Sequence, residues 1–64
     1  MQVLTPSEVA MLEDVRRRLR RCLLTLRRLR FKSRGVEQAC RNIERAIVTI
    51  DSVISFYRRV YGYK

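Results

Sequence analysis

The chain has 64 residues, of which 47% are hydrophobic and 33% are charged, and its formal net charge is +9. The hydrophobic content excludes an intrinsically disordered chain, and the length fits one small domain over residues 1–64. No apolar run approaches the roughly 18 residues that cross a bilayer, so we expect no transmembrane segment.

The first predicted helix begins at Pro6 and continues to about residue 32. Thr5 suits the N-cap position, Pro6 suits the first helical position, and Glu8 is placed to complete a capping box. Apolar residues then recur at alternating spacings of three and four, which is typical of a narrow packing stripe. The stripe consists of Leu12, Val15, Leu19, Cys22, Leu26 and Leu29. The sequence therefore predicts a helix over residues 6–32 that buries this stripe.

A turn is predicted at about residues 33–35. Ser33 can cap a helix there, and Gly35 can adopt the left-handed conformation that ends one. A second helix is predicted over about residues 36–61, because its apolar residues follow a helical spacing although many are β-branched. Its broader stripe consists of Val36, Ala39, Cys40, Ile43, Ala46, Ile47, Ile50, Val53, Ile54, Tyr57, Val60 and Tyr61.

Two arrangements of these helices fit the pattern. The first is an all-α fold made of an antiparallel two-helix hairpin. The second is one long continuous coiled-coil helix, since the apolar spacing continues from Leu29 through Ser33 to Val36 in register. Gly35 would cost such a helix only about 1 kcal/mol. A serine and a glycine between two helical halves are more simply explained as a turn, and we predict the hairpin.

The apolar face of the second helix is broader than the stripe of the first helix can cover. Two amphipathic helices alone also form a thin core. We therefore expect a homodimer that closes a four-helix bundle. Cys22 and Cys40 both fall on the apolar stripes, so we expect two buried thiols and no disulfide.

Ten of the fifteen basic residues lie between Arg16 and Arg34, and no acidic residue interrupts them. This stretch carries +10, against −3 for residues 1–15 and +2 for residues 35–64. At about 100° per residue, part of it forms a face of the first helix opposite the apolar stripe. This arginine face consists of Arg17, Arg20, Arg21, Leu24, Arg27, Arg28 and Phe31. Because like charges on a helix repel one another, the absence of acids indicates an anionic partner.

Nucleic acid is the leading hypothesis for that partner. Arginines along about three turns can neutralise several phosphates, with Phe31 available to stack on exposed bases. No helix-turn-helix, zinc-finger or RNA-recognition signature is present, so we expect binding to the phosphate backbone without strong sequence specificity.

The alternative hypothesis is a protein-interaction module, such as an adaptor or inhibitor of viral or mobile-element origin. Leu24 and Phe31 lie one heptad apart among arginines, which resembles an apolar anchor pair with a charged rim for an acidic protein surface. Binding to an anionic lipid surface is a weaker third hypothesis, because the apolar stripe is already used for helix packing.

Catalytic chemistry is not expected. The chain has no histidine, its cysteines lack the spacing of zinc ligands, and its six carboxylates are scattered without a nucleophilic partner. We therefore predict that the protein is not an enzyme and holds no metal or cofactor. The N-terminus does not resemble a secretory signal, so we expect a cytoplasmic location.

The C-terminal segment is aromatic. Tyr57 and Tyr61 continue the apolar stripe and are expected to pack in the core. Phe56 and Tyr63 fall outside the stripe, and the sequence leaves open whether they pack or extend the binding surface.

Overall fold

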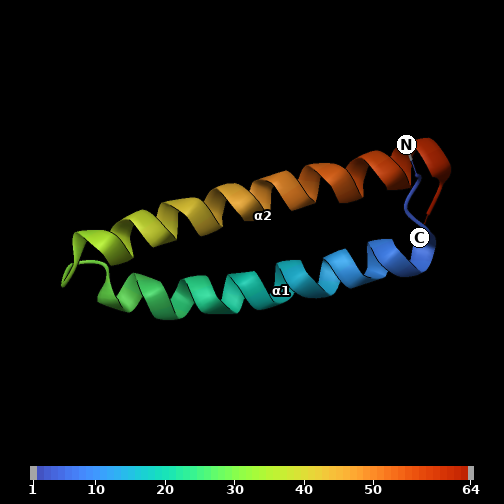
Figure 1. Cartoon of the computed structure of the whole chain (residues 1–64). Coiled ribbons are helices and arrows are strands. Elements are labelled where there is room, and N and C mark those ends of the chain that lie inside the picture. Colours follow the sequence, from blue (N-terminus) through green and yellow to red (C-terminus); the bar gives the residue numbers. More distant parts are fainter. Residues whose placement is uncertain (1, 64) are drawn as a thin grey trace.

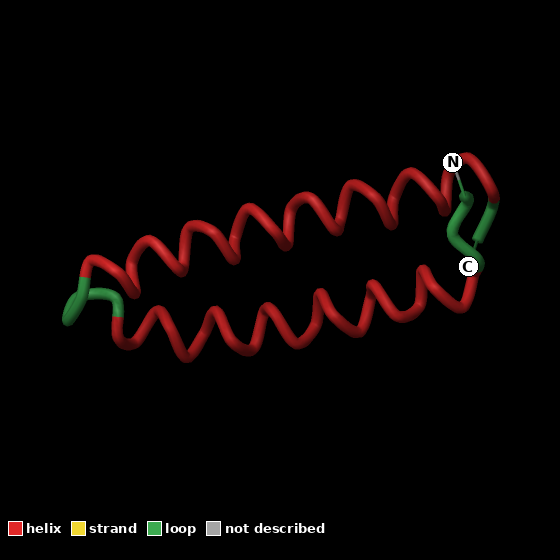
Figure 2. The backbone as a smooth tube through the Cα atoms, in the orientation of Figure 1, coloured by secondary structure: helices red, strands yellow, loops and turns green. Residues whose placement is uncertain are grey.

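The computed structural model describes residues 2–63, which form two helices side by side and antiparallel (Figure 1). Helix α1 spans Pro6–Leu29 and helix α2 spans Arg34–Tyr61, so 84% of the described residues are helical. Loop segments of the described residues occur only at the two ends of this arrangement, and the first and last described residues lie at the end opposite the turn (Figure 2). The predicted all-α hairpin is confirmed. The continuous helix is wrong because the chain reverses direction after Leu29.

The start of α1 has the predicted capping box. The Thr5 hydroxyl accepts a hydrogen bond from the Glu8 amide at 3.1 Å, and the Glu8 carboxylate accepts one from the Thr5 amide at 2.9 Å. Pro6 occupies the first helical position, where the missing N–H costs nothing. Local sequence alone therefore determines this boundary.

The turn differs from the prediction in its boundaries and in the role of its glycine. Helix α1 ends at Leu29, three residues before the predicted end, and the Lys32 amide donates to the Leu29 carbonyl at 3.0 Å. Ser33 is the extended N-cap residue of α2, although its side chain makes no capping hydrogen bond. Gly35 lies in the first turn of α2, so its predicted left-handed conformation is wrong. The left-handed glycine is Gly62, which ends α2 with φ 67°.

The buried residues form one line along each helix. They are Val9 and Leu23 of α1 with Cys40, Ile47 and Ile54 of α2. Leu23, Cys40 and Ile47 form a cluster against which partly buried Leu19, Leu26, Val36 and Ile43 pack. The broad stripe predicted for α2 therefore contains the residues that pack on α1.

The buried line of α1 is rotated from the predicted stripe. Leu23 is 6% exposed, whereas Cys22 and Leu29 are exposed and Val15 is 43% exposed. The prediction of a buried Cys22 is therefore wrong, while both cysteines are free as expected. The rotation brings Arg16 toward α2, and its charge makes that position unlike a core position in sequence.

Arg16 is accommodated by an ion pair between the helices. Its guanidinium donates to the Asp51 carboxylate of α2, and its side chain is only 21% exposed. A second inter-helix pair joins Arg58 to Glu13 at 2.5 Å. Long basic side chains can cover apolar surface with their methylene groups while the charged end finds a partner. These two ion pairs explain why charged residues take part in the contact between α1 and α2 beside the apolar ones.

Aromatic residues near the C-terminus hold the segment before α1 against the end of α2. The Leu4 amide donates to the Tyr57 hydroxyl at 3.3 Å, and the Tyr63 hydroxyl donates to the Leu4 carbonyl at 2.9 Å. Ring centroids of Tyr57 and Tyr61 lie 5.2 Å apart, those of Tyr57 and Tyr63 lie 6.0 Å apart, and Phe56 meets Tyr57 edge-on at 5.5 Å. Phe56 and Tyr63 thus belong to the packing at this end of the hairpin.

Candidate nucleic-acid interface

All seven residues of the predicted arginine face are exposed. Six of them lie on α1, between residues 17 and 28. Phe31 is 86% exposed and lies in the turn, because α1 ends before it. The structure thus brings the seven residues to one side of α1 and its adjoining turn.

The arginine face adjoins α2 and is not opposite it. Since the buried line passes through Leu23 and not Cys22, the centre of the arginine face lies about 100° around α1 from the buried line. The sequence prediction placed it opposite the packing stripe, and the rotation of α1 described above accounts for the difference. As a result, side chains of both helices border this face.

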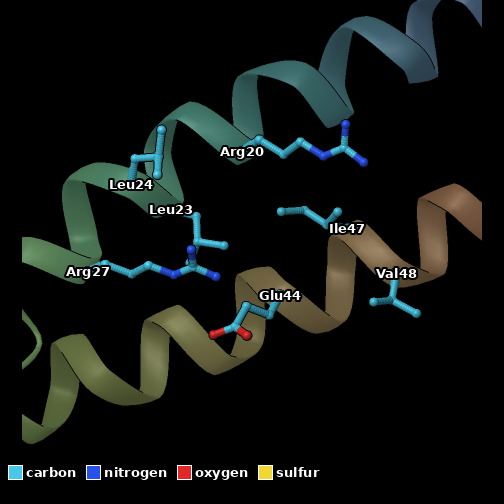
Figure 3. Close-up of a pocket in the computed structure, with 7 residues that line it drawn as sticks. All are labelled: Arg20, Leu23, Leu24, Arg27, Glu44, Ile47 and Val48. Carbon is cyan, nitrogen blue, oxygen red and sulfur yellow. The ribbon is translucent and has the colours of Figure 1, made fainter.

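A groove runs between the helices along this border, with a volume of about 480 Å³ (Figure 3). Leu23 and Ile47 form its floor, and Leu24 and Val48, 62% and 64% exposed, lie at its edges. Charged side chains complete the lining, namely Arg20, Arg27 and Glu44. The groove therefore offers apolar surface beside two arginines and one carboxylate.

Part of the arginine face is neutralised within the chain. Arg17 lies 3.4 Å from a carboxylate oxygen of Asp14, and Arg20 lies 3.5 Å from one of Asp51. Among residues 2–63, no carboxylate comes within 4.0 Å of Arg21, Arg27 or Arg28. The free positive charge of the face is therefore concentrated toward the turn.

Three further basic residues extend this charge around the turn. Arg30, Lys32 and Arg34 lie at or beside the turn, are exposed, and have no carboxylate partner in the described part of the chain. Together with the unpaired arginines of the face they form a group that we name the turn-end cations. Its members are Arg21, Arg27, Arg28, Arg30, Lys32 and Arg34.

The arginine face predicted from helical spacing does not include Arg30, Lys32 and Arg34. They were already visible in the uninterrupted basic stretch, but their position depends on where α1 ends. Phe31 lies among them, and the Arg30 guanidinium carbon is 4.7 Å from its ring centroid. This cation–π contact orients an exposed aromatic ring within a positive surface.

Two other features of the described residues bear on function. No group of three His, Cys, Asp or Glu side chains that could hold a metal ion occurs among residues 2–63. Neither α1 nor α2 is long and apolar enough to cross a membrane.

The chain matches no family model, and no curated protein or solved structure matches it significantly.

Proposed function

We propose that the protein binds the phosphate backbone of nucleic acid through the arginine face and the turn-end cations, without strong sequence specificity. The observation that carries this proposal is that the six turn-end cations follow one another from the second half of α1 around the turn to the start of α2, without any carboxylate partner among the described residues. Like charges brought together in this way repel one another, and a polyanion relieves that repulsion. Phosphate oxygens also match the forked donors of arginine.

The chemistry of the surface favours backbone contact over base reading. The exposed cations are distributed along α1 and around the turn, as a phosphate chain requires, whereas specific readout needs a few side chains fixed against base edges. Phe31 is the one ring within this surface that is exposed enough to stack on an unpaired base. Single-stranded segments are therefore included among the proposed ligands.

The test is a fluorescence anisotropy titration of labelled DNA and RNA at several salt concentrations. Because each neutralised phosphate contributes about −0.9 to the slope of log K against log salt on B-DNA, several contacts give a steep slope. Unrelated sequences should bind about equally. Weak binding that does not depend on salt would overturn the proposal.

A second candidate function is docking on an acidic protein surface, and the groove is the observation that favours it. Leu24 and Val48 border apolar floor residues, with Arg20 and Arg27 beside them, as expected for an apolar anchor site with a charged rim. Under this alternative, Leu24→Ala or Phe31→Ala would weaken capture of the partner more than any single arginine substitution. Nucleic acid would then bind weakly.

We also propose that the protein acts as a homodimer in the cytoplasm. A folded monomer of 7.7 kDa exposes about 4,300 Å² of surface, whereas this hairpin exposes 5361 Å². The excess of about 1,000 Å² is close to the roughly 800 Å² that each partner buries in a standard interface. Two free cysteines, one of them exposed, suit a reducing compartment.

A further inference from the structure

The hairpin has an uncharged face on the side away from the arginines. Its members are Val15, Cys22 and Leu29 of α1 with Ala39, Ala46 and Val53 of α2. Val15 and Leu29 are 43% and 42% exposed, Cys22 is exposed, and the three α2 residues are half-buried. The charged residues closest to it on α1 are Asp14 and Arg18, which pair with each other at 3.0 Å.

Consecutive residues show that the two halves of this face lie on the same side. In α1, Leu23 is buried and Leu24 lines the groove, so Cys22 lies about 100° from Leu23 in the other direction. In α2, Ile47 is buried and Val48 lines the same groove, so Ala46 lies on the other side in the same way. The uncharged face and the arginine face are therefore opposite sides of the hairpin.

The uncharged face can form the centre of an interface with a second copy of the chain. Its residues span 14 positions of each helix, about 21 Å, and so occupy about half of a side that measures 43 by 18 Å. The whole side covers about 770 Å², close to the share of one partner in a standard interface. Ala39, Ala46 and Cys22 are small side chains, which allow the backbones of two helices to approach closely. The surface that the single hairpin exposes also exceeds the surface expected for a folded monomer of its mass by a similar area.

The distribution of charge along the hairpin selects one orientation of that second copy. The turn half, residues 18–46, has ten basic and two acidic residues, a net charge of +8. The other half, residues 2–17 and 47–63, has four basic and four acidic residues, a net charge of 0. Two copies with their turns at the same end would place two highly positive halves together. With turns at opposite ends, each positive half lies beside a neutral one, which lowers the repulsion.

We propose that two copies pack through their uncharged faces with turns at opposite ends, and that this dimer bridges two nucleic-acid segments. Because the arginine face is on the opposite side of each hairpin from the uncharged face, the dimer directs its two arginine faces outward in opposite directions. Each can bind a separate segment, and linking two binding surfaces makes the second contact intramolecular once both segments are close. The bridging step rests on the proposed nucleic-acid function, whereas the packing of the two copies does not.

Disulfide formation tests the packing. Two uncharged faces in this orientation overlap fully when the twofold axis passes through their common centre, at Cys22 and Ala46, so Cys22 of one copy lies close to the partner's Cys22. Mild oxidation of the wild-type protein should therefore give a covalent dimer. Cys22→Ser, which removes this thiol, should not. The control is the double variant Cys22→Ser with Val48→Cys, which moves the exposed thiol to the groove side and should remain monomeric under denaturing electrophoresis.

Absence of the covalent dimer in the oxidised wild type, or an equal yield in the double variant, would overturn the proposed packing. The readout does not depend on any nucleic acid.

Capture of a second DNA tests the bridging. DNA on beads is saturated with protein and then mixed with a labelled DNA of another sequence. Wild-type protein should retain the label. Ala46→Arg places a charge in the uncharged face and should abolish retention while first-segment binding is unchanged. Ser52→Arg adds the same charge at an exposed position of α2 that lies about 120° around the helix from Ala46, and it should retain the label.

The outcomes separate the two proposals. If the protein binds the immobilised DNA but retains no second DNA, bridging is wrong and the nucleic-acid function stands. If it binds neither, the proposed function itself fails. Retention by Ala46→Arg equal to that of the wild type would overturn the role of the uncharged face.

Discussion

Arg16 of α1 and Asp51 of α2 form an ion pair that crosses between the two helices. They are 35 positions apart in sequence, and the Arg16 side chain is only 21% exposed. The pair places a guanidinium in the line that otherwise contains Val9, Leu23 and other apolar side chains. This line is the side of α1 that meets α2, and its position sets where the arginine face lies.

Removing the carboxylate of this pair should therefore destabilise the hairpin. In Asp51→Asn, Arg16 remains partly buried without its charged partner, and we expect the free energy of unfolding to fall by about 1–2 kcal/mol. Asp14→Asn removes a carboxylate whose partners, Arg17 and Arg18, are exposed and lie on its own helix, and should cost under about 0.5 kcal/mol. Urea denaturation at one fixed protein concentration measures both. Equal costs would show that the inter-helix pair has no special role.

The two glycines should respond to alanine with opposite signs. Gly35 is helical, and a Cβ there would lie 3.5 Å from the Ser33 hydroxyl oxygen, an ordinary contact. Gly35→Ala should stabilise the protein by about 0.5–1 kcal/mol. Gly62 has φ 67°, so Gly62→Ala should destabilise it by about 1 kcal/mol. Thermal denaturation of the two variants gives the signs, and a destabilising Gly35→Ala would contradict the helical assignment.

Neighbouring leucines test the rotation of α1. Leu23 is 6% exposed and belongs to the core cluster, so Leu23→Ala should cost about 2–4 kcal/mol. Leu24 is 62% exposed, and the same substitution there should change stability by less than about 0.5 kcal/mol. Denaturant titration of both variants checks this. Comparable losses would mean that α1 faces α2 differently.

Sequence reasoning predicted the features that depend on local interactions. The capping box needs only Thr5 and Glu8, three positions apart, and the hairpin follows from two helical patterns around a short polar segment. The orientation of α1 could not be predicted in this way. Leu19 belongs equally to the predicted and observed stripes, and the choice between Cys22 and Leu23 depends on contacts with the distant helix α2, the Arg16–Asp51 pair among them.

The candidate site likewise has features that the sequence predicts and features that depend on tertiary structure. The basic stretch and the exposure of its arginines follow from composition and helical spacing. Which arginines are neutralised depends on the position of Asp51, and the contribution of Arg30 depends on the end of α1 at Leu29. The first is a result of tertiary structure, and the second depends on a helix end that lacks a strong sequence signal.

The contact between the two chain ends should depend on the Tyr63 hydroxyl. Tyr63→Phe removes its hydrogen bond to the Leu4 carbonyl and should cost about 1 kcal/mol. Tyr61→Phe is the matched control, because the Tyr61 hydroxyl makes no hydrogen bond within residues 2–63. Hydrogen exchange at the Leu4 amide should accelerate in Tyr63→Phe only. Unchanged exchange would show that the ring stacking and the Leu4–Tyr57 hydrogen bond hold this end without the Tyr63 hydroxyl.

Paired arginine substitutions test the central claim, that the turn end binds phosphates, most directly. Arg28 and Arg45 are both exposed, and neither has a carboxylate partner among the described residues. Arg45 lies about 160° around α2 from buried Ile47, on the outer side of that helix. Both alanine substitutions therefore remove one charge, but only Arg28→Ala removes one from the arginine face.

The measurement is the slope of log K against log salt for a DNA duplex. The account predicts that Arg28→Ala reduces the slope by about one and that Arg45→Ala leaves it unchanged. Equal reductions in the two variants, or no reduction in Arg28→Ala, would contradict it.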